Sequence, residues 1–191
     1  VISNEEGICY IDALPLGKYW IKQTIAGDGF VLNTEQKDIV LSYVGDKEAI
    51  SYAEVLYENE RQKISIVLEN KDSQTKENIK GGMFGLYTQE EISYQTNTGE
   101  TVIVPKNTLV ARQTVTEEGK IEWNATKNID LPLANYQIKQ IQTPDGYASN
   151  EKIIFIQATY QGQNVPVIEK KVTFKNDITK LIIQLQDRET K

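Results

Sequence analysis

The sequence contains no histidine among its 191 residues, and it has one cysteine and one methionine. Because imidazole is the usual general base near neutral pH and a common zinc ligand, its absence excludes the triads and metal sites that depend on it. The single cysteine cannot form an internal disulfide. We therefore expect a chain that is not an enzyme, with no catalytic residue, no bound metal and no other cofactor.

Long apolar runs are missing as well, since none approaches the roughly 20 residues that a membrane-spanning helix needs. The first residues (VISNEEG) have neither a basic start nor an apolar signal segment. Lys and Arg number 21 against 27 Asp and Glu, which gives a formal net charge of -6. Such a chain has no basic surface for a phosphate backbone, so we expect neither a nucleic-acid partner nor membrane insertion of this segment.

What the sequence does contain is an internal repeat. The stretch LPLGKYWIKQ begins at Leu14 and returns as LPLANYQIKQ at Leu131, so the two copies lie 117 residues apart (131 minus 14). Each copy is followed by Asp-Gly and an aromatic residue, at 28–30 and at 145–147. A repeat of this length has the size of a whole domain, which predicts a tandem array of domains and not a solenoid.

The repeat divides the chain into three parts. Residues 1–61 correspond to the C-terminal part of a first domain, residues 62–178 to a complete domain, and residues 179–191 to the opening strand of a third repeat or a tail. Alternating apolar residues, as at Ile64 and Ile66, and turn-forming glycines at regular intervals are typical of strands with one buried face. We therefore expect an all-β chain of immunoglobulin-like β-sandwiches.

Several motifs of the complete domain carry a family resemblance. They are, in chain order, IKGGMFGLY, TEEGKIEW, LPLANYQIKQIQTPDGY and VTFKN. In this order they resemble the B-type repeat domains of collagen adhesins (Cna B-type), also called SpaA-like or prealbumin-like domains, of Gram-positive surface proteins. The resemblance implies a stalk or spacer module of an adhesin or pilus, exported to the cell surface or cell wall. Its immediate partners would then be neighbouring repeat domains of the same surface protein.

The resemblance also implies a site. Many members of the family join a lysine of the first strand to an asparagine of the last strand through an isopeptide bond, with an acidic residue that transfers protons. Here the asparagine is present as Asn59 and Asn176. The acidic position holds Gln23 or Gln140, and the lysine position of the complete domain holds Asn70. Because an amide neither gives nor takes a proton at neutral pH, we expect the domains to lack the bond and to keep an amide cluster in its place.

Two lysines of the same strand leave an alternative open. Lys63 begins the strand, and Lys71 directly follows the expected lysine position. A β-bulge would turn Lys71 toward the core. In that case a cross-link from Lys71 to Asn176 would form in spite of the missing acid.

A second function also stays open, that of an adhesin module that recognises a host protein or a glycan. Trp20 alternates with Tyr19 and Ile21, which we place in the core, so Trp20 is expected to face outward. Either an outward patch around Trp20 or the loop region 89–105 is the candidate binding surface.

The incomplete first unit raises two further expectations. By comparison with Ile121 and Trp123, Cys9 holds a core-facing strand position and is expected to be a buried small side chain, unless the half-built unit leaves it exposed. The stub at 181–185 is an unpaired strand. It would be able to complete the first unit of another copy by head-to-tail strand exchange. The alternative is that the chain is a fragment of a longer array.

Overall fold

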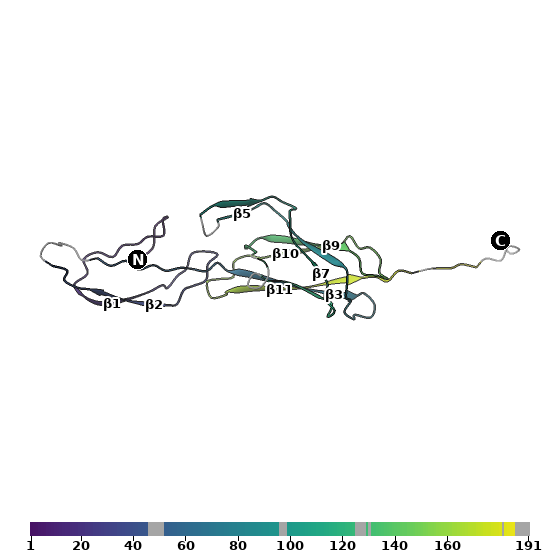
Figure 1. The fold of residues 1–191 in the computed structure, drawn as a ribbon, viewed down its shortest axis with the longest axis horizontal. Coiled ribbons are helices and arrows are strands. Elements are labelled where there is room, and N and C mark those ends of the chain that lie inside the picture. Colours follow the sequence, from purple (N-terminus) through teal and green to yellow (C-terminus); the bar gives the residue numbers. More distant parts are fainter. Residues whose placement is uncertain (46–51, 96–98, 125–128, 130, 181, 186–191) are drawn as a thin grey trace.

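The computed structural model describes residues 1–45, 52–95, 99–124, 129, 131–180 and 182–185. The molecule is elongated, with a two-stranded sheet toward one end, a larger two-sheet body, and an extended C-terminal segment at the other end (Figure 1). All regular elements of the described residues are β-strands, which confirms the expected all-β fold. Within these residues, no helix is long and apolar enough to cross a membrane.

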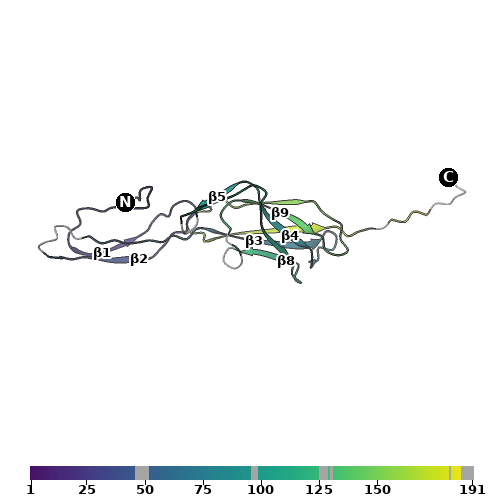
Figure 2. The ribbon, with the colours of Figure 1, turned by 45° about the horizontal axis from the view of Figure 1, so that its top comes forward.

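The larger body is a β-sandwich of two sheets that lie face to face (Figure 2). One sheet has the strand order β10-β9-β4-β7, and the other has the order β11-β3-β8. Neighbouring strands are antiparallel except β3 and β11, which run parallel along their full length of 10 residues. The strands of the sandwich are β3 (Lys63–Asp72), β4 (Met83–Thr88), β7 (Leu109–Thr114), β8 (Lys120–Asn124), β9 (Asn135–Gln142), β10 (Ile153–Gln157) and β11 (Val167–Asn176).

Alternate side chains of these strands fill the space between the sheets, because successive residues of a strand point to opposite faces. On β3 the side chains of Ile64, Ile66 and Leu68 are fully buried. Phe84 of β4 meets Phe174 of β11 nearly edge to face across the core, with ring centroids 4.8 Å apart. Burial of each such side chain contributes about 1.5 to 3 kcal/mol, so packing alone supplies a large stabilising term.

Two turns of the sandwich require glycine. Gly119 joins β7 to β8 with a φ of +71°, and a Cβ atom there would lie 2.6 Å from the Cβ atom of Asn78. Gly82 precedes β4 with a φ of +75°, and a Cβ atom there would lie 2.9 Å from the carbonyl oxygen of Gln142. Any other residue would combine backbone strain with a clash at these positions.

The region of residues 1–61 contains a smaller sheet, in which β1 (Gly17–Lys22) and β2 (Gln36–Leu41) pair antiparallel. The side chains of Tyr19 and Ile21 are half-buried on one face of this hairpin. Trp20 lies on the other face, where its side chain is 64% exposed. The outward orientation expected for Trp20 is therefore the one that the strand adopts.

The segment 52–59 lies against the hairpin without forming a strand of its own. The Tyr57 hydroxyl donates a hydrogen bond to the carbonyl oxygen of Ile21 (2.6 Å). From β2, Lys37 Nζ donates to the carbonyl oxygen of Leu56 (2.8 Å). These long-range bonds hold residues 52–59 in place, although much of the apolar surface of this region stays exposed.

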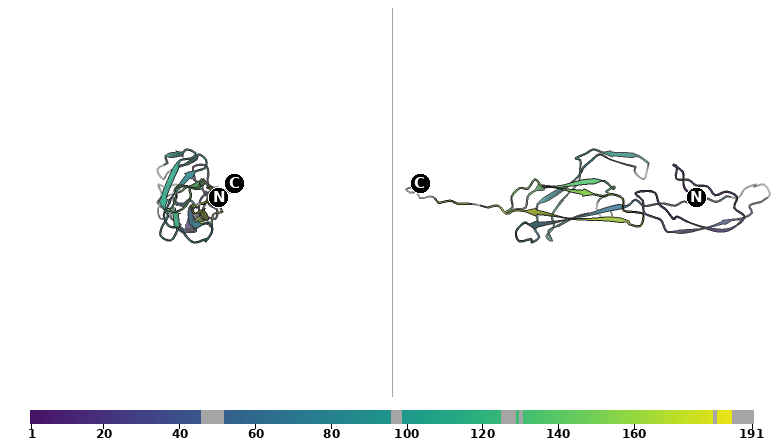
Figure 3. Two further views of the ribbon diagram at one scale, coloured as in Figure 1. Left: turned by 90° about the vertical axis from the view of Figure 1, so that its right-hand side faces the viewer. Right: turned by 180° about the vertical axis from the view of Figure 1, so that it is seen from behind.

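The expected loop region 89–105 is largely a second two-stranded sheet, formed by β5 (Ile92–Gln95) and β6 (Thr101–Val104). This hairpin projects from the body of the sandwich (Figure 3). Residues 96–98, within the same region, lie outside the described residues. The Arg61 guanidinium lies 5.8 Å from the centre of the Tyr94 ring of β5.

Two expectations for the chain ends differ from the structure. Cys9 is exposed and is not part of a strand, so the expectation of a buried side chain was wrong and the exposed alternative holds. The physical reason is that no second sheet of the described residues covers this part of the chain. The expected opening strand at 181–185 is not formed by residues 182–185, where Ile183 is 73% exposed and Leu185 is 95% exposed. Residues 181 and 186–191 lie outside the described residues.

The same pattern of hydrogen bonds is found where the chain leaves the N-terminal region and where it leaves the sandwich. In each case the Asp-Gly-aromatic turn pairs with the residues that follow the last segment of the unit, and the corresponding residues are 117 positions apart. The main-chain bonds, from N–H to carbonyl oxygen, are Val31 to Glu60 (2.8 Å), Gln62 to Gly29 (2.8 Å), Ala148 to Asp177 (2.8 Å) and Thr179 to Gly146 (3.1 Å). The isolated β-bridges Phe30 to Arg61 and Tyr147 to Ile178 complete the correspondence.

Candidate functional site

Three amide side chains meet between the two sheets of the sandwich. Asn176 Nδ2 donates to Asn70 Oδ1 (2.5 Å), and Gln140 Nε2 donates to Asn176 Oδ1 (2.8 Å). Asn70 Nδ2 in turn donates to the carbonyl oxygen of Ile79 (3.3 Å). Asn70 and Asn176 are completely buried. These three residues, called the amide cluster below, are the ones that the sequence placed at the three positions of the family's bond-forming site.

Strand register explains why the three side chains meet. Asn70 lies beside Phe174 in the parallel pairing of β3 with β11, so that Asn176 of β11 is one inward-facing position further along. Gln140 of β9 lies opposite Phe84 of β4, next to a register shift between Met83 and Phe84. The cluster therefore links two adjacent strands of one sheet to a strand of the facing sheet.

The main chain of Asn70 is held on both sides. Its N–H donates to the carbonyl oxygen of Gly119 (2.8 Å), and its carbonyl oxygen accepts from the N–H of Ile79 (2.8 Å). With these bonds made, the Asn70 side chain has little freedom to leave the cluster. Such over-determined positions are where a buried polar network adds rigidity.

One atom of the cluster has no partner. Gln140 Oε1 is buried and accepts no hydrogen bond, whereas Gln140 Nε2 is paired. A buried acceptor without a donor costs about 1 to 3 kcal/mol. In chemical terms the cluster contains hydrogen-bond donors and acceptors but no nucleophilic amine and no group that titrates near neutral pH.

The corresponding residues of the N-terminal region do not form such a cluster. Gln23 Oε1 accepts from the main-chain N–H of Asn33 (3.2 Å). Asn59 Oδ1 is buried and has no partner. The hydrogen bond that joins Gln140 to Asn176 thus has no counterpart between Gln23 and Asn59.

The structure places both lysines of β3 away from the cluster. The register of β3 against β11 runs without a shift from Lys63 to Asp72, so the bulge that would turn Lys71 inward is not formed. Lys71 points to the outer face, where its Nζ lies 3.2 Å from a carboxylate oxygen of Glu69. Lys63 Nζ lies 3.4 Å from a carboxylate oxygen of Glu60. In this arrangement neither amine reaches Asn176.

Asp72 lies beside Asn176 in the pairing of β3 with β11, and its carboxylate has a different role. Its Oδ1 accepts from the main-chain N–H groups of Gln74 (2.7 Å) and Thr75 (2.9 Å), and its Oδ2 accepts from the Tyr147 hydroxyl (3.1 Å). The main-chain bonds from Thr75 and Gln74, and then the Tyr147 bond, lower the pKa of Asp72 below its usual value in spite of partial burial. Asp72 therefore stays ionised and stabilises a turn, and it is not suited to shuttle protons.

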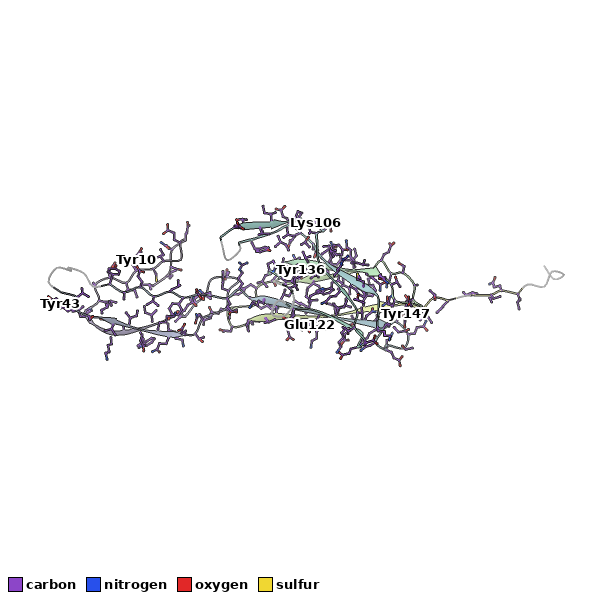
Figure 4. All side chains as sticks on the ribbon, in the orientation of Figure 1. Tyr10, Tyr43, Lys106, Glu122, Tyr136 and Tyr147 are labelled. Carbon is purple, nitrogen blue, oxygen red and sulfur yellow. The ribbon has the colours of Figure 1, made fainter. Side chains whose placement is uncertain are left out.

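Sequence reasoning did not find the Asp72–Tyr147 pair. The Asp-x-x-Thr spacing at 72–75 is a local signal for a side chain that accepts hydrogen bonds in a turn. The partnership with Tyr147, 75 residues away, depends on how β3 and the turn after β9 pack together. Figure 4 shows Tyr147 at the end of the sandwich from which the C-terminal segment leaves.

A comparison with known families and structures gives three results. The family model for the SpaA prealbumin-like fold domain matches residues 64–173. No curated protein matches the chain with significance. Among solved structures, the TIE protein of Bacillus anthracis superposes with a TM-score of 0.62 at 19% identity, over 92% of this chain and 28% of that chain.

Two pilins are also similar. The pilus 2b backbone protein of group B streptococcus has a TM-score of 0.43 at 16% identity, over 68% of this chain and 47% of that chain. A mutant form of the shaft pilin SpaA from Lactobacillus rhamnosus GG has a TM-score of 0.44 at 14% identity, over 87% of this chain and 64% of that chain. The chain spans less than two thirds of each of these three structures.

Proposed function

Because the chain belongs to the SpaA family of prealbumin-like fold domains, we propose that it is a stalk or spacer segment of a bacterial cell-surface protein. In this proposal the parent protein is a cell-wall-associated pilin or adhesin, and the segment acts outside the cell. Its units are residues 1–61, 62–178 and the start of a third at 179–191, and its partners are neighbouring units of the same protein or its polymer.

The observation that carries this proposal is the repeated exit pattern. The main-chain bonds at 29–31 with 60–62 recur at 146–148 with 177–179. At the first place the chain passes directly into β3 of the sandwich, and this supports a second sandwich following in the same way after Thr179. If each unit is joined to the next through the same hydrogen bonds, the units follow one another in a regular, extended row, which is what a spacer requires.

The order of the strands suits a segment under tension. The chain enters the sandwich at the start of β3 and leaves it at the end of β11, and these strands are parallel neighbours. A force applied at the two ends therefore pulls β3 and β11 past each other along their length. Their interstrand hydrogen bonds then share the load, in place of opening one after another.

The amide cluster supports a spacer without the family's isopeptide bond. Bond formation would require an amine to attack the Asn176 carboxamide and ammonia to leave, with proton transfer by a neighbouring acid. The cluster offers Asn70 in place of the amine and Gln140 in place of the acid. The hydrogen bonds among the three amides connect the same strands that the covalent bond would connect.

The intact mass of the denatured protein tests this proposal. A mass equal to that computed from the sequence is expected. A deficit of one ammonia would contradict the missing bond, and peptide mapping would then distinguish Lys71 from Lys63 as the donor. The variant Lys71→Arg is the matched control, because it keeps the Glu69 ion pair and removes the candidate amine.

A second candidate function is recognition of a host protein or glycan by an exposed surface. The favouring observation is the exposed face of the β1–β2 hairpin, where Trp20 is 64% and Val40 is 60% exposed. Large apolar side chains exposed together are typical of interaction sites. Binding to glycan and matrix-protein arrays, lost in Trp20→Ala, would support this function.

A further inference from the structure

The loop between β10 and β11 contacts two parts of the chain at once. Its residues 161–166, called the coupling loop, follow the sandwich strand β10 and lie against the N-terminal region. Gln163 alone makes three hydrogen bonds to that region. Its Nε2 donates to the carbonyl oxygen of Thr24 (3.2 Å), and its Oε1 accepts from the N–H of Ala26 (2.8 Å). Its main-chain carbonyl oxygen accepts from the N–H of Leu32 (2.8 Å).

The Gln163 carboxamide pairs with main-chain groups in the way that a neighbouring strand would. One donor and one acceptor in a single plane meet a carbonyl oxygen and an N–H that are two residues apart. Ala26 is only 6% exposed, so the bond to its N–H is shielded from water and gains strength. Because both bonds go to the main chain, the pairing does not depend on the side chains at 24 and 26.

A second glutamine holds the coupling loop in shape. Gln62 is 2% exposed, and its Oε1 accepts from the N–H of Gln161 (3.0 Å). Its Nε2 donates to the carbonyl oxygens of Gly162 (3.1 Å) and Val165 (2.5 Å). Its own main-chain N–H donates to Gly29 in the N-terminal region (2.8 Å). Gln62 thus binds both the coupling loop and the N-terminal region, and it fixes the loop in the position from which Gln163 contacts that region.

From these contacts we propose that the coupling loop is an interaction surface for the main chain of the preceding unit, and that Gln163 sets the angle between the two units. This inference rests on the proposed arrangement of consecutive units. The partner it fits is the short segment between a strand and the Asp-Gly-aromatic turn that follows it, such as residues 23–27 after β1. At the far end of the sandwich the positions corresponding to Thr24 and Ala26 are Ile141 and Thr143, which makes that end the surface for a following unit.

Spin labels on the full chain test the proposal. In a Cys9→Ser background, Lys18→Cys places one label at an exposed position of β1, and Thr173→Cys places the other at an exposed position of β11. We expect a narrow distribution of distances between the labels, and a broader one in Gln163→Ala. Gln161→Ala is the matched control in the same loop, because Gln161 takes part through its main-chain N–H. An equally narrow distribution in Gln163→Ala would overturn the proposal.

Amide hydrogen exchange gives a second, local readout that does not depend on the labels. In Gln163→Ala the Ala26 N–H loses its acceptor, and its exchange is expected to accelerate about tenfold. Unchanged exchange at Ala26 would contradict the role of the side chain. Either negative result leaves the spacer proposal standing, because that proposal is tested separately by the intact mass and by mechanical unfolding.

Discussion

The hydroxyl of Tyr147 donates a hydrogen bond to Asp72 Oδ2 across 75 residues of sequence, at a distance of 3.1 Å. Asp72 ends β3, the first strand of the sandwich, and Tyr147 belongs to the turn after β9, which pairs with Ile178 where the chain leaves the sandwich. This pair therefore connects the first strand to the turn that holds the leaving chain, close to the point where tension would enter from a following unit. Its strength depends on pH, because both groups can titrate.

The first prediction concerns acid. The pKa of Asp72 lies below its usual 3.8 in the folded protein, mainly because the Thr75 and Gln74 N–H groups bind its charged form. The stability gained from this is complete above pH 3.8 and is lost as the pH falls through the lower, folded-state pKa. Urea unfolding of the parent and of Asp72→Asn should show a difference that is constant above pH 3.8 and shrinks below it.

A second prediction concerns alkali. Burial, and then the hydrogen bond to the Asp72 carboxylate, raises the pKa of Tyr147 above 10.0 in the folded protein. This contribution is complete below pH 10.0 and is lost as the pH rises through the raised pKa. Tyr147→Phe should therefore be less stable than the parent at neutral pH, with a difference that diminishes above pH 10.0. A difference that does not vary with alkaline pH would contradict this assignment.

A third prediction concerns the amide cluster. Asn176→Ala leaves Asn70 Oδ1 and Gln140 Nε2 buried without their partners, and we expect the free energy of unfolding to fall by about 2 to 5 kcal/mol. The matched control is Asn59→Ala, because Asn59 Oδ1 already has no partner. A loss within about 1 kcal/mol is expected there. Equal losses in the two variants would show that the cluster is not a stabilising link.

A fourth prediction is mechanical. When the chain is stretched from its ends in a single-molecule experiment, the sandwich from β3 to β11 should unfold and lengthen the chain by the full contour length of these residues. At 3.3 to 3.6 Å per residue this is about 40 nm for residues 63–176. A bond between β3 and Asn176 would instead keep most of that length locked. The absence of a step of this size would contradict the proposed spacer without a cross-link.

A fifth prediction separates the two candidate functions. Trp20 is exposed, and its replacement by alanine should change the free energy of unfolding by less than about 0.5 kcal/mol. Lys18→Ala, on the same face of β1, is the control for a general loss of surface. If Trp20→Ala alone abolishes binding to a glycan or matrix protein, the binding function is supported. Binding that is unaffected by Trp20→Ala would contradict a role for this face.

The inward placement of Asn70, Gln140 and Asn176 was predictable from the sequence. Each lies on a strand whose alternating apolar residues reveal the buried face, and the repeat relates the strands to one another. The same alternation predicted an exposed Trp20. Local periodicity was sufficient because each of these statements concerns a side chain relative to its own strand.

Other features could not be predicted from the sequence, because they depend on contacts between distant segments. The bonds of Gln163 to Thr24 and Ala26 depend on how two loop segments more than 130 residues apart pack together. Whether Lys71 faces in or out depends on a single bulge, which sequence pattern alone does not report. The prediction that Cys9 is buried was wrong because burial requires a second sheet that covers the strand, and strand alternation carries no information about that sheet.

The hydrogen bonds that are repeated where each unit ends have a consequence for the dimensions of the parent protein. If every unit passes to the next through the same hydrogen bonds, each added unit contributes the same advance and the same rotation. The distance of a terminal binding domain from the cell wall would then grow in equal steps with the number of units. Gain or loss of one repeat in the gene would change the reach of the surface protein by one step and leave the shape of every other unit unaltered.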